Sequence, residues 1–303
     1  MTIWHFLPYL STASKLGEPV LSEANVNSNT ISQLNLTDTD RNKTNASVML
    51  SVDSNLCYEG TYDIAKAIDE LLTRKPKEIA LDLSKVGIVD SSGLRSLLRA
   101  RKACEEAGVQ LRIESASKCM ERALVMSGLA QAFQMTNRVQ STWLETSSSS
   151  LVAPHSESDS SCWAVREYVA VSDPYVISLL RDRAVAVAVE AGATDAAICD
   201  IQIAVGEALT NAFKHGSPHK GIDKIILRCF RCKEAVAFEI EDEGNEFDPD
   251  SIPEPDPSKM CDNGMGIYLM RQAMDKVEFQ HNCPGNRVRL LKRLRSEQSS
   301  RLI

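Results

Sequence analysis

Glu207 and Asn211 stand four positions apart in "AAICDIQIAVGEALTNAFKHG", a segment whose apolar residues recur with the period of a helix. Residues four apart lie one above the other on the same helix face, and Thr210 and Lys214 lie near them. An Asn carbonyl oxygen suits Mg²⁺, and a carboxylate one turn away can take a proton or hold a water molecule. The pattern therefore fits either a solvated polar face or a Mg²⁺ site beside a general base.

Two later segments have the composition of a nucleotide pocket. Asp242 follows the strand pattern "VAFEIE" and precedes Gly244. It is either part of an ordinary turn or a carboxylate in a pocket where a flat ring can approach the backbone. Gly264 and Gly266 then open an apolar helix, where glycines let phosphate reach the backbone amides. Each motif is short, so it is their order along the chain that indicates a nucleotide site.

A pair of adjacent serines, Ser91 and Ser92, lies where a strand pattern runs directly into a helix pattern, between Asp90 and Gly93. Asp90 or Ser91 can cap this helix, which is worth about 1 kcal/mol, but capping explains only one polar residue. A phosphate at a helix N-terminus is favoured by the helix dipole and adds nearly two charges to a surface. The segment is therefore a helix cap at which phosphorylation could change a docking surface without unfolding the helix.

Alternating strand and helix patterns must position these groups, and they divide the chain in two. Residues 47–140 and residues 163–297 each predict an α/β domain in which helices cover a sheet. Residues 1–46, with a stretch rich in Asn, Ser and Thr, predict a disordered arm, and residues 141–162 predict a flexible linker. The expected fold class is therefore α/β with two domains.

Composition excludes several classes of protein. A net charge of −7 argues against a protein that binds nucleic acid or an anionic membrane through a broad basic surface, and no apolar run is long enough for a membrane helix. The nine cysteines are scattered and odd in number, which is typical of a reducing cytosol rather than of a disulfide framework. We therefore expect a cytoplasmic protein with no membrane segment and no direct contact with nucleic acid.

The order of the later motifs resembles the ATP-binding fold of gyrase, Hsp90 chaperones, histidine kinases and MutL, the GHKL family. Within that family, "VGEALTNAFKHG", "EDEGNEFDP" and "GMGIYLMRQAMDKVEF" resemble the anti-sigma-factor serine kinases. The resemblance implies a two-layer α/β sandwich, the Bergerat fold, that binds ATP and Mg²⁺. By the same resemblance, Glu207 is the catalytic base, Asn211 the Mg²⁺ ligand and Asp242 the adenine anchor. The glycines of the implied pocket and its lid are Gly244, Gly264 and Gly266.

The earlier segment resembles the STAS domain of bacterial anti-sigma-factor antagonists, through "VDSSGLRSLLRARK", "GVQLRIESAS" and "ALVMSGLAQAF". The resemblance implies a small mixed sheet with flanking helices. It also implies that a partner kinase phosphorylates Ser91, with Ser92 as the alternative acceptor. This chain departs from the usual arrangement because antagonist and kinase are normally separate chains, and because Gly206 stands where the kinases often have Ser.

Together, the resemblances imply a partner-switching regulator of transcription, in which a serine kinase and anti-sigma module is fused to its own STAS antagonist. The expected partners are a sigma factor and separate STAS or anti-sigma proteins, with contact between the domains of one chain or of two chains. Phosphorylation within one chain, between chains, or on a separate STAS protein all remain open. The alternative is a protein that binds nucleotide without catalysis and uses its STAS domain to sense a partner.

Overall fold

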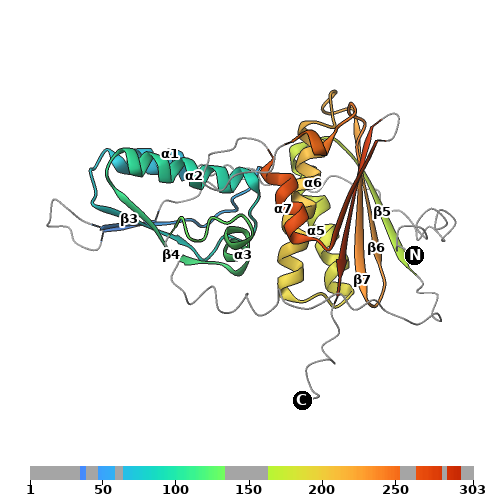
Figure 1. Cartoon of the computed structure of the whole chain (residues 1–303), viewed down its shortest axis with the longest axis horizontal. Helices are drawn as coiled ribbons and strands as arrows, with labels where there is room; N and C mark the ends of the chain where they lie inside the picture. The colour runs from blue at the N-terminus through green and yellow to red at the C-terminus, as the bar shows by residue number, and fades with distance from the viewer. Residues whose placement is uncertain are drawn as a thin grey trace, which may run out of the picture.

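The computed structural model describes residues 35–38, 47–58, 64–133, 163–252, 264–281 and 285–294. Figure 1 shows two α/β domains that lie side by side, the first with a mostly parallel sheet and the second with an antiparallel one. This confirms the expected fold class. The predicted linker lies outside the described residues, as does most of the predicted arm.

The N-terminal domain is built on a four-stranded sheet in the order β1-β2-β3-β4. Strand β1 pairs antiparallel with β2, whereas β2, β3 and β4 pair in parallel. Since β1 lies within the range predicted as an arm, the sheet begins before residue 47. The strands are β1 (Asn35–Asp38), β2 (Ser47–Ser51), β3 (Glu78–Leu83) and β4 (Gln110–Ala116).

Three helices pack on this sheet: α1 (Ile64–Leu72), α2 (Ser91–Glu106) and α3 (Lys118–Met126). The predicted cap of α2 is confirmed, because one oxygen of the Asp90 carboxylate accepts hydrogen bonds from the backbone N–H groups of Ser92 and Gly93. Its other oxygen accepts from the N–H of Tyr58 at 2.7 Å. A Cβ on Gly93 would lie 2.1 Å from the carbonyl oxygen of Leu56. The start of α2 is thus held against the segment that contains Leu56 and Tyr58. The Asp90 carboxylate bonds to that segment, and the backbones approach closely at Gly93.

The C-terminal domain has a five-stranded antiparallel sheet in the order β5-β6-β7-β9-β8. Figure 1 shows helices α5, α6 and α7 as a layer between this sheet and the N-terminal domain. The domain is therefore a two-layer α/β sandwich. The strands are β5 (Ala164–Val171), β6 (Lys224–Arg231), β7 (Ala235–Glu241), β8 (Lys276–His281) and β9 (Asn286–Arg293). The helices are α5 (Pro174–Glu190), α6 (Asp195–Lys214), α7 (Met265–Ala273) and the short η4 (Pro249–Ser251).

Local sequence sets where these helices begin. Asp173 caps α5, Pro174 occupies its first turn as predicted, and Thr194 caps α6. Gly206, in the middle of α6, faces α5, where a Cβ would lie 3.4 Å from the buried Arg181 side chain. A small side chain at this position would therefore just touch the long side chain of the neighbouring helix.

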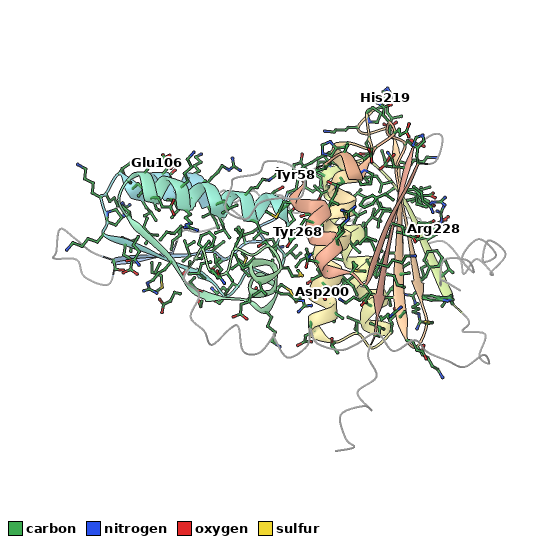
Figure 2. All side chains as sticks on the ribbon, in the orientation of Figure 1. Tyr58, Glu106, Asp200, His219, Arg228 and Tyr268 are labelled. Atoms are coloured by element: carbon green, nitrogen blue, oxygen red, sulfur yellow. A yellow bond between two sulfur atoms is a disulfide. The ribbon has the colours of Figure 1, made fainter. Side chains whose placement is uncertain are left out.

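The boundary between the domains is packed like a protein interior. Ile203 of α6 and Met265 and Leu269 of α7 belong to the same buried cluster as the core of the N-terminal domain. Figure 2 shows Tyr58 and Tyr268 at this boundary, and the ring of Tyr58 lies 5.8 Å from that of Phe213 on α6. In this structure the two domains therefore pack against one another within one chain.

Charged and sulfur-containing side chains complete the boundary. Lys118 of α3 pairs with Asp195 of α6 at 2.9 Å, and Arg122 of α3 pairs with the fully buried Asp200 of α6, which Figure 2 labels at the boundary. Between these pairs, Cys119 of α3 and Cys199 of α6 form a disulfide. The sequence, from which we expected no disulfide framework, did not indicate this single bond. The cause is the docking of α3 on α6, which brings together cysteines that are 80 residues apart in the sequence.

Candidate active site

A cavity of about 520 Å³ lies at the C-terminal end of α6, between α7 and the strands β7, β8 and β9. Most of the residues that the sequence motifs singled out line it. The lining residues from those motifs are Ser91, Glu207, Thr210, Asn211, Lys214, Asp242, Gly264 and Gly266.

Glu207 and Ser91 meet across the domain boundary at the wall of this cavity. The Ser91 hydroxyl donates to Oε2 of Glu207 at 3.0 Å, and the Ser91 backbone N–H donates to Oε1. Both side chains are buried, with Glu207 only 1% exposed. The Glu207 carboxylate therefore accepts both from an N–H group at the start of α2 and from the Ser91 hydroxyl of the N-terminal domain.

The protonation of Glu207 is shifted by this environment. Burial, and after it the charge of Asp90, raise the pKa of Glu207 to about 7, against the opposing effects of the Ser91 hydrogen bonds and the charge of Lys214. A carboxyl group with a pKa near neutrality can take up and release a proton under ordinary conditions. The pair of Glu207 and Ser91 thus has the chemistry of a general base beside a nucleophile.

Asp242 lies at the end of β7 with its two carboxylate oxygens in different surroundings. Its Oδ1 accepts hydrogen bonds from the N–H of Gly244 at 3.0 Å and from the N–H and side-chain amide of Asn286 at 3.2 and 3.0 Å. Within the described part of the chain, no donor is placed on Oδ2, which packs beside Gly216. One oxygen therefore fixes the carboxylate and the other can accept from a ligand such as the amino group of adenine.

Two glycines, Gly216 and Gly244, leave the space that the Asp242 carboxylate occupies. A Cβ on Gly216 would lie 2.3 Å from Oδ2 of Asp242, and one on Gly244 would lie 2.5 Å from Cα of Gly216. Gly244 was predicted as part of the pocket but does not line the cavity. It instead donates its N–H to Asp242 and packs behind it.

The polar groups of α6 fit a nucleotide with a metal ion. Thr210 is 3% exposed, lines the cavity and has a hydroxyl with no hydrogen-bond partner, so a polar ligand is expected there. Asn211 lines the same wall. In the described residues no three His, Cys, Asp or Glu side chains are grouped to hold a metal. A Mg²⁺ ion at Asn211 would therefore need the phosphate oxygens of a nucleotide as further ligands, which is a common arrangement for this ion.

The predicted glycine loop opens α7 beside Glu207. Gly264 has φ of 91°, a left-handed conformation that favours glycine, and it is the N-cap residue of the helix without a side chain to cap it. A Cβ on Gly266 would lie 2.3 Å from Oε2 of Glu207. The start of α7 therefore offers backbone N–H groups to the cavity and leaves room there for Glu207.

Sequence reasoning missed three residues that shape the site. Arg95 of α2 lines the cavity, Asn286 fixes Asp242, and Gly216 makes room for that carboxylate. The signal for Arg95 was available, because a residue four positions after Ser91 lies on the same face of α2. Ser92, the alternative phosphoacceptor, does not line the cavity, and its hydroxyl lies 3.4 Å from the Lys214 ammonium.

Comparison with known families agrees with this division of the chain. Residues 37–142 match the STAS domain model, and residues 171–292 match the model of the histidine kinase-like ATPase domain. Both matches confirm the resemblances stated from the motifs.

Curated relatives identify the family of the second domain more closely. The serine-protein kinase RsbW of Bacillus subtilis strain 168 is 30% identical over 135 residues, which are 42% of this chain and 84% of the relative. The chain belongs to the RsbW family. The serine-protein kinase RsbW of Staphylococcus aureus is 34% identical over 131 residues, which are 40% of this chain and 82% of the relative. The RsbW-type domain is here preceded by a STAS domain in the same chain.

One solved structure is also similar to part of the chain. A crystal structure of the RsbU and RsbW domains of a Mycobacterium tuberculosis protein matches 43% of this chain and 32% of that chain, at 17% identity and a TM-score of 0.34. A likeness at that score supports no argument about the site.

We expect the substitution Asp242→Asn to weaken ATP binding by about 1.5–3 kcal/mol, roughly 10- to 150-fold. The Asn carbonyl can keep the three hydrogen bonds now made to Oδ1. Its amide group would then replace Oδ2 with a donor, which repels the adenine amino group. Calorimetric titration of the full chain with Mg-ATP measures the effect, and a thermal melt checks that the variant is folded. Unchanged affinity in a folded variant would remove Asp242 from the nucleotide site.

Proposed function

We propose that this chain is an ATP-dependent serine kinase that phosphorylates Ser91 of its own STAS domain. The observation that supports this proposal most directly is the 3.0 Å hydrogen bond from the Ser91 hydroxyl to Glu207 at the wall of the cavity. A phosphoacceptor in contact with a general base satisfies the geometric requirement for the reaction. The RsbW-type domain and the STAS domain supply the two modules of a partner switch.

In the proposed reaction, Glu207 accepts the hydroxyl proton as Ser91 Oγ attacks the terminal phosphoryl group of ATP. A new bond forms between Oγ and phosphorus, the bond to the ADP oxygen breaks, and ADP leaves. The Ser91 N–H that donates to Glu207 keeps the carboxylate in register with the hydroxyl. The chain's main contribution is therefore to position the nucleophile and to hold its proton.

Other residues of the cavity would hold the nucleotide. Asp242 would accept from the adenine amino group, Asn211 would hold Mg²⁺, and the start of α7 at Gly264 and Gly266 would donate backbone N–H groups to phosphate. When bound, Mg²⁺ neutralises charge on the phosphate oxygens. These roles are consistent with the cavity volume of about 520 Å³, which lies within the range of small-molecule sites.

Phosphorylation would also control docking. Ser91 is buried against Glu207 and near Asp90, so a phosphate on Ser91 would bring a near-dianion against two carboxyl groups. The dipole of α2 favours the charge by only about 0.3–1 kcal/mol, which is less than such burial costs. We therefore infer that phosphorylation releases the STAS domain from the kinase domain, and that a sigma factor or a separate STAS protein competes for the exposed surface.

None of the described helices is both long and apolar enough to cross a membrane.

We expect the purified full chain to transfer labelled phosphate from ATP to Ser91, as located by mass spectrometry. The single-turnover rate should rise with pH up to about 7 and level off above it, because Glu207 must be ionised to accept the proton and burial raises its pKa to about 7. The variant Glu207→Gln should lose about 10²- to 10⁴-fold in rate and keep most of its nucleotide binding.

Two results would contradict the kinase proposal. Nucleotide binding without any phosphate on the chain or on an added STAS domain would favour the non-catalytic alternative. A Glu207→Gln variant with a normal rate would show that another group takes the proton.

A second prediction concerns docking in the full chain. Ser91→Asp should loosen the boundary because the new carboxylate faces Glu207, whereas Ser91→Ala should leave the domains docked. Ser92→Asp is the matched control, because the Ser92 hydroxyl lies 3.4 Å from the Lys214 ammonium and a carboxylate there can pair with it. Hydrogen exchange followed by mass spectrometry at the start of α2 and along α6 reports docking. We expect faster exchange only in Ser91→Asp, and equal exchange in all three variants would exclude the release mechanism.

A further inference from the structure

The N-terminal domain contributes to the wall of the nucleotide cavity. Among the described residues that line the cavity, two come from this domain, Ser91 and Arg95, and both lie on α2. They are four positions apart and therefore on the same face of the helix, about one turn from each other. Docking of the STAS domain thus brings a guanidinium group, as well as a hydroxyl, into the cavity.

The charges around the hydroxyl make a cation necessary there. The Glu207 carboxylate accepts from the Ser91 hydroxyl and so lies where a phosphoryl group must arrive, and the Asp90 carboxylate at the cap of the same helix adds a second negative charge nearby. Lys214 of α6 lies on the other side, with its ammonium 4.1 Å from the centre of the Tyr58 ring and 3.4 Å from the Ser92 hydroxyl. Lys214 and Arg95 both line the cavity, but the Lys214 ammonium is held beside Ser91 by its contacts with the STAS domain, and only Arg95 belongs to the same domain as Ser91.

We propose that Arg95 binds the terminal phosphate of the nucleotide, so that the substrate domain completes the nucleotide site of the kinase domain. A planar guanidinium suits this task because it can donate two parallel hydrogen bonds to phosphate oxygens. The inference rests on the proposed function. It adds a residue that selects a nucleoside triphosphate over the corresponding diphosphate.

Because Arg95 belongs to the substrate domain, it remains close to Ser91 after the phosphate has been transferred. After transfer, the phosphate is attached to Ser91, and Arg95 lies one helical turn away in the same domain, where oppositely charged groups four apart attract each other. The same guanidinium can therefore stay with the phosphate when the STAS domain leaves. A cation of the kinase domain such as Lys214, which also lines the cavity, cannot leave with the phosphorylated STAS domain.

The test measures the affinity of the full chain for Mg-ADP and for the Mg complex of a non-hydrolysable ATP analogue with an imido bridge. Arg95→Gln should weaken binding of the analogue about tenfold or more and change the affinity for ADP less than about twofold. Arg95→Lys should restore part of the loss, because it keeps the charge without the planar fork. Arg99→Gln is the matched control, since Arg99 is exposed on the next turn of α2 and does not line the cavity.

The outcomes separate this inference from the proposed function. A wild-type chain that binds neither nucleotide would overturn the proposed function. A wild-type chain that binds both, together with an Arg95→Gln variant that loses neither or loses both equally, would overturn the role of Arg95 alone. Circular dichroism and a thermal melt establish that each variant is folded before its affinities are compared.

The disulfide between Cys119 and Cys199 supports a second, independent inference. It joins α3 of the STAS domain to α6 of the kinase domain, and the ion pairs Lys118–Asp195 and Arg122–Asp200 hold these helices together on either side of it. Cys119 is partly exposed, so a small oxidant can reach it, whereas Cys199 is 5% exposed. We infer that this pair is a thiol switch whose oxidation locks the STAS domain on the kinase domain.

A hydroperoxide is the class of oxidant that fits this switch. The Cys119 sulfur attacks the peroxide, is oxidised to a sulfenic acid, and releases an alcohol or water. The Cys199 sulfur then attacks that sulfur, forms the disulfide and releases water, so that the two thiols together lose two electrons and two protons. A dithiol reverses the step by thiol–disulfide exchange.

Full-length protein treated with a hydroperoxide should gain a Cys119–Cys199 cross-linked peptide and exchange hydrogen more slowly at the start of α2, and dithiothreitol should reverse both changes. Cys199→Ser should abolish both, while Cys232→Ser, which removes a partly exposed free thiol, should abolish neither. Absence of the cross-link, or unchanged exchange when it forms, would overturn the switch.

Discussion

The structure depends on one buried carboxylate, Glu207, whose charge is satisfied by the other domain. Its two oxygens accept from the backbone N–H and the hydroxyl of Ser91, at the positive end of the dipole of α2. Leaving a buried carboxylate without such partners is costly, so the site and the domain boundary are stabilised by the same contacts. The group that can remove the proton from Ser91 is also one that holds the two domains in register.

The surface through which the two domains dock therefore also carries the contact between Ser91 and Glu207. The apolar part of the boundary places Ile203, Met265 and Leu269 in the core cluster of the STAS domain, and two ion pairs join α3 to α6 beside it. Neither part can distinguish a phosphorylated from an unphosphorylated serine. Under the proposed function, that distinction would come from the contact of Ser91 with Glu207, where a phosphate would add negative charge to the boundary.

The sequence could predict whatever is set within one helix or strand. The spacing of Glu207 and Asn211, the cap at Asp90 and the glycines at the start of α7 all follow from local rules, and the structure places them at one cavity or at the predicted helix end. Local rules could not predict the contact of Ser91 with Glu207, which only the family resemblance implied, or the disulfide of Cys119, because these join residues 116 and 80 positions apart through docking. Helical periodicity indicates which face a residue occupies and gives no information about which other domain will cover that face.

Helix α7 has a consequence for the thermodynamics of this chain. Met265 lines the nucleotide cavity and also belongs to the core cluster of the STAS domain, to which Leu269 on the same helix contributes. A ligand that shifts the start of α7 must therefore shift the surface on which the STAS domain rests. Because binding energies are linked in both directions, any nucleotide that tightens docking must itself be bound more tightly by the docked form, and by the same factor. The docked STAS domain thus acts on the nucleotide preference of the ATPase-like domain to the same degree as the nucleotide acts on docking.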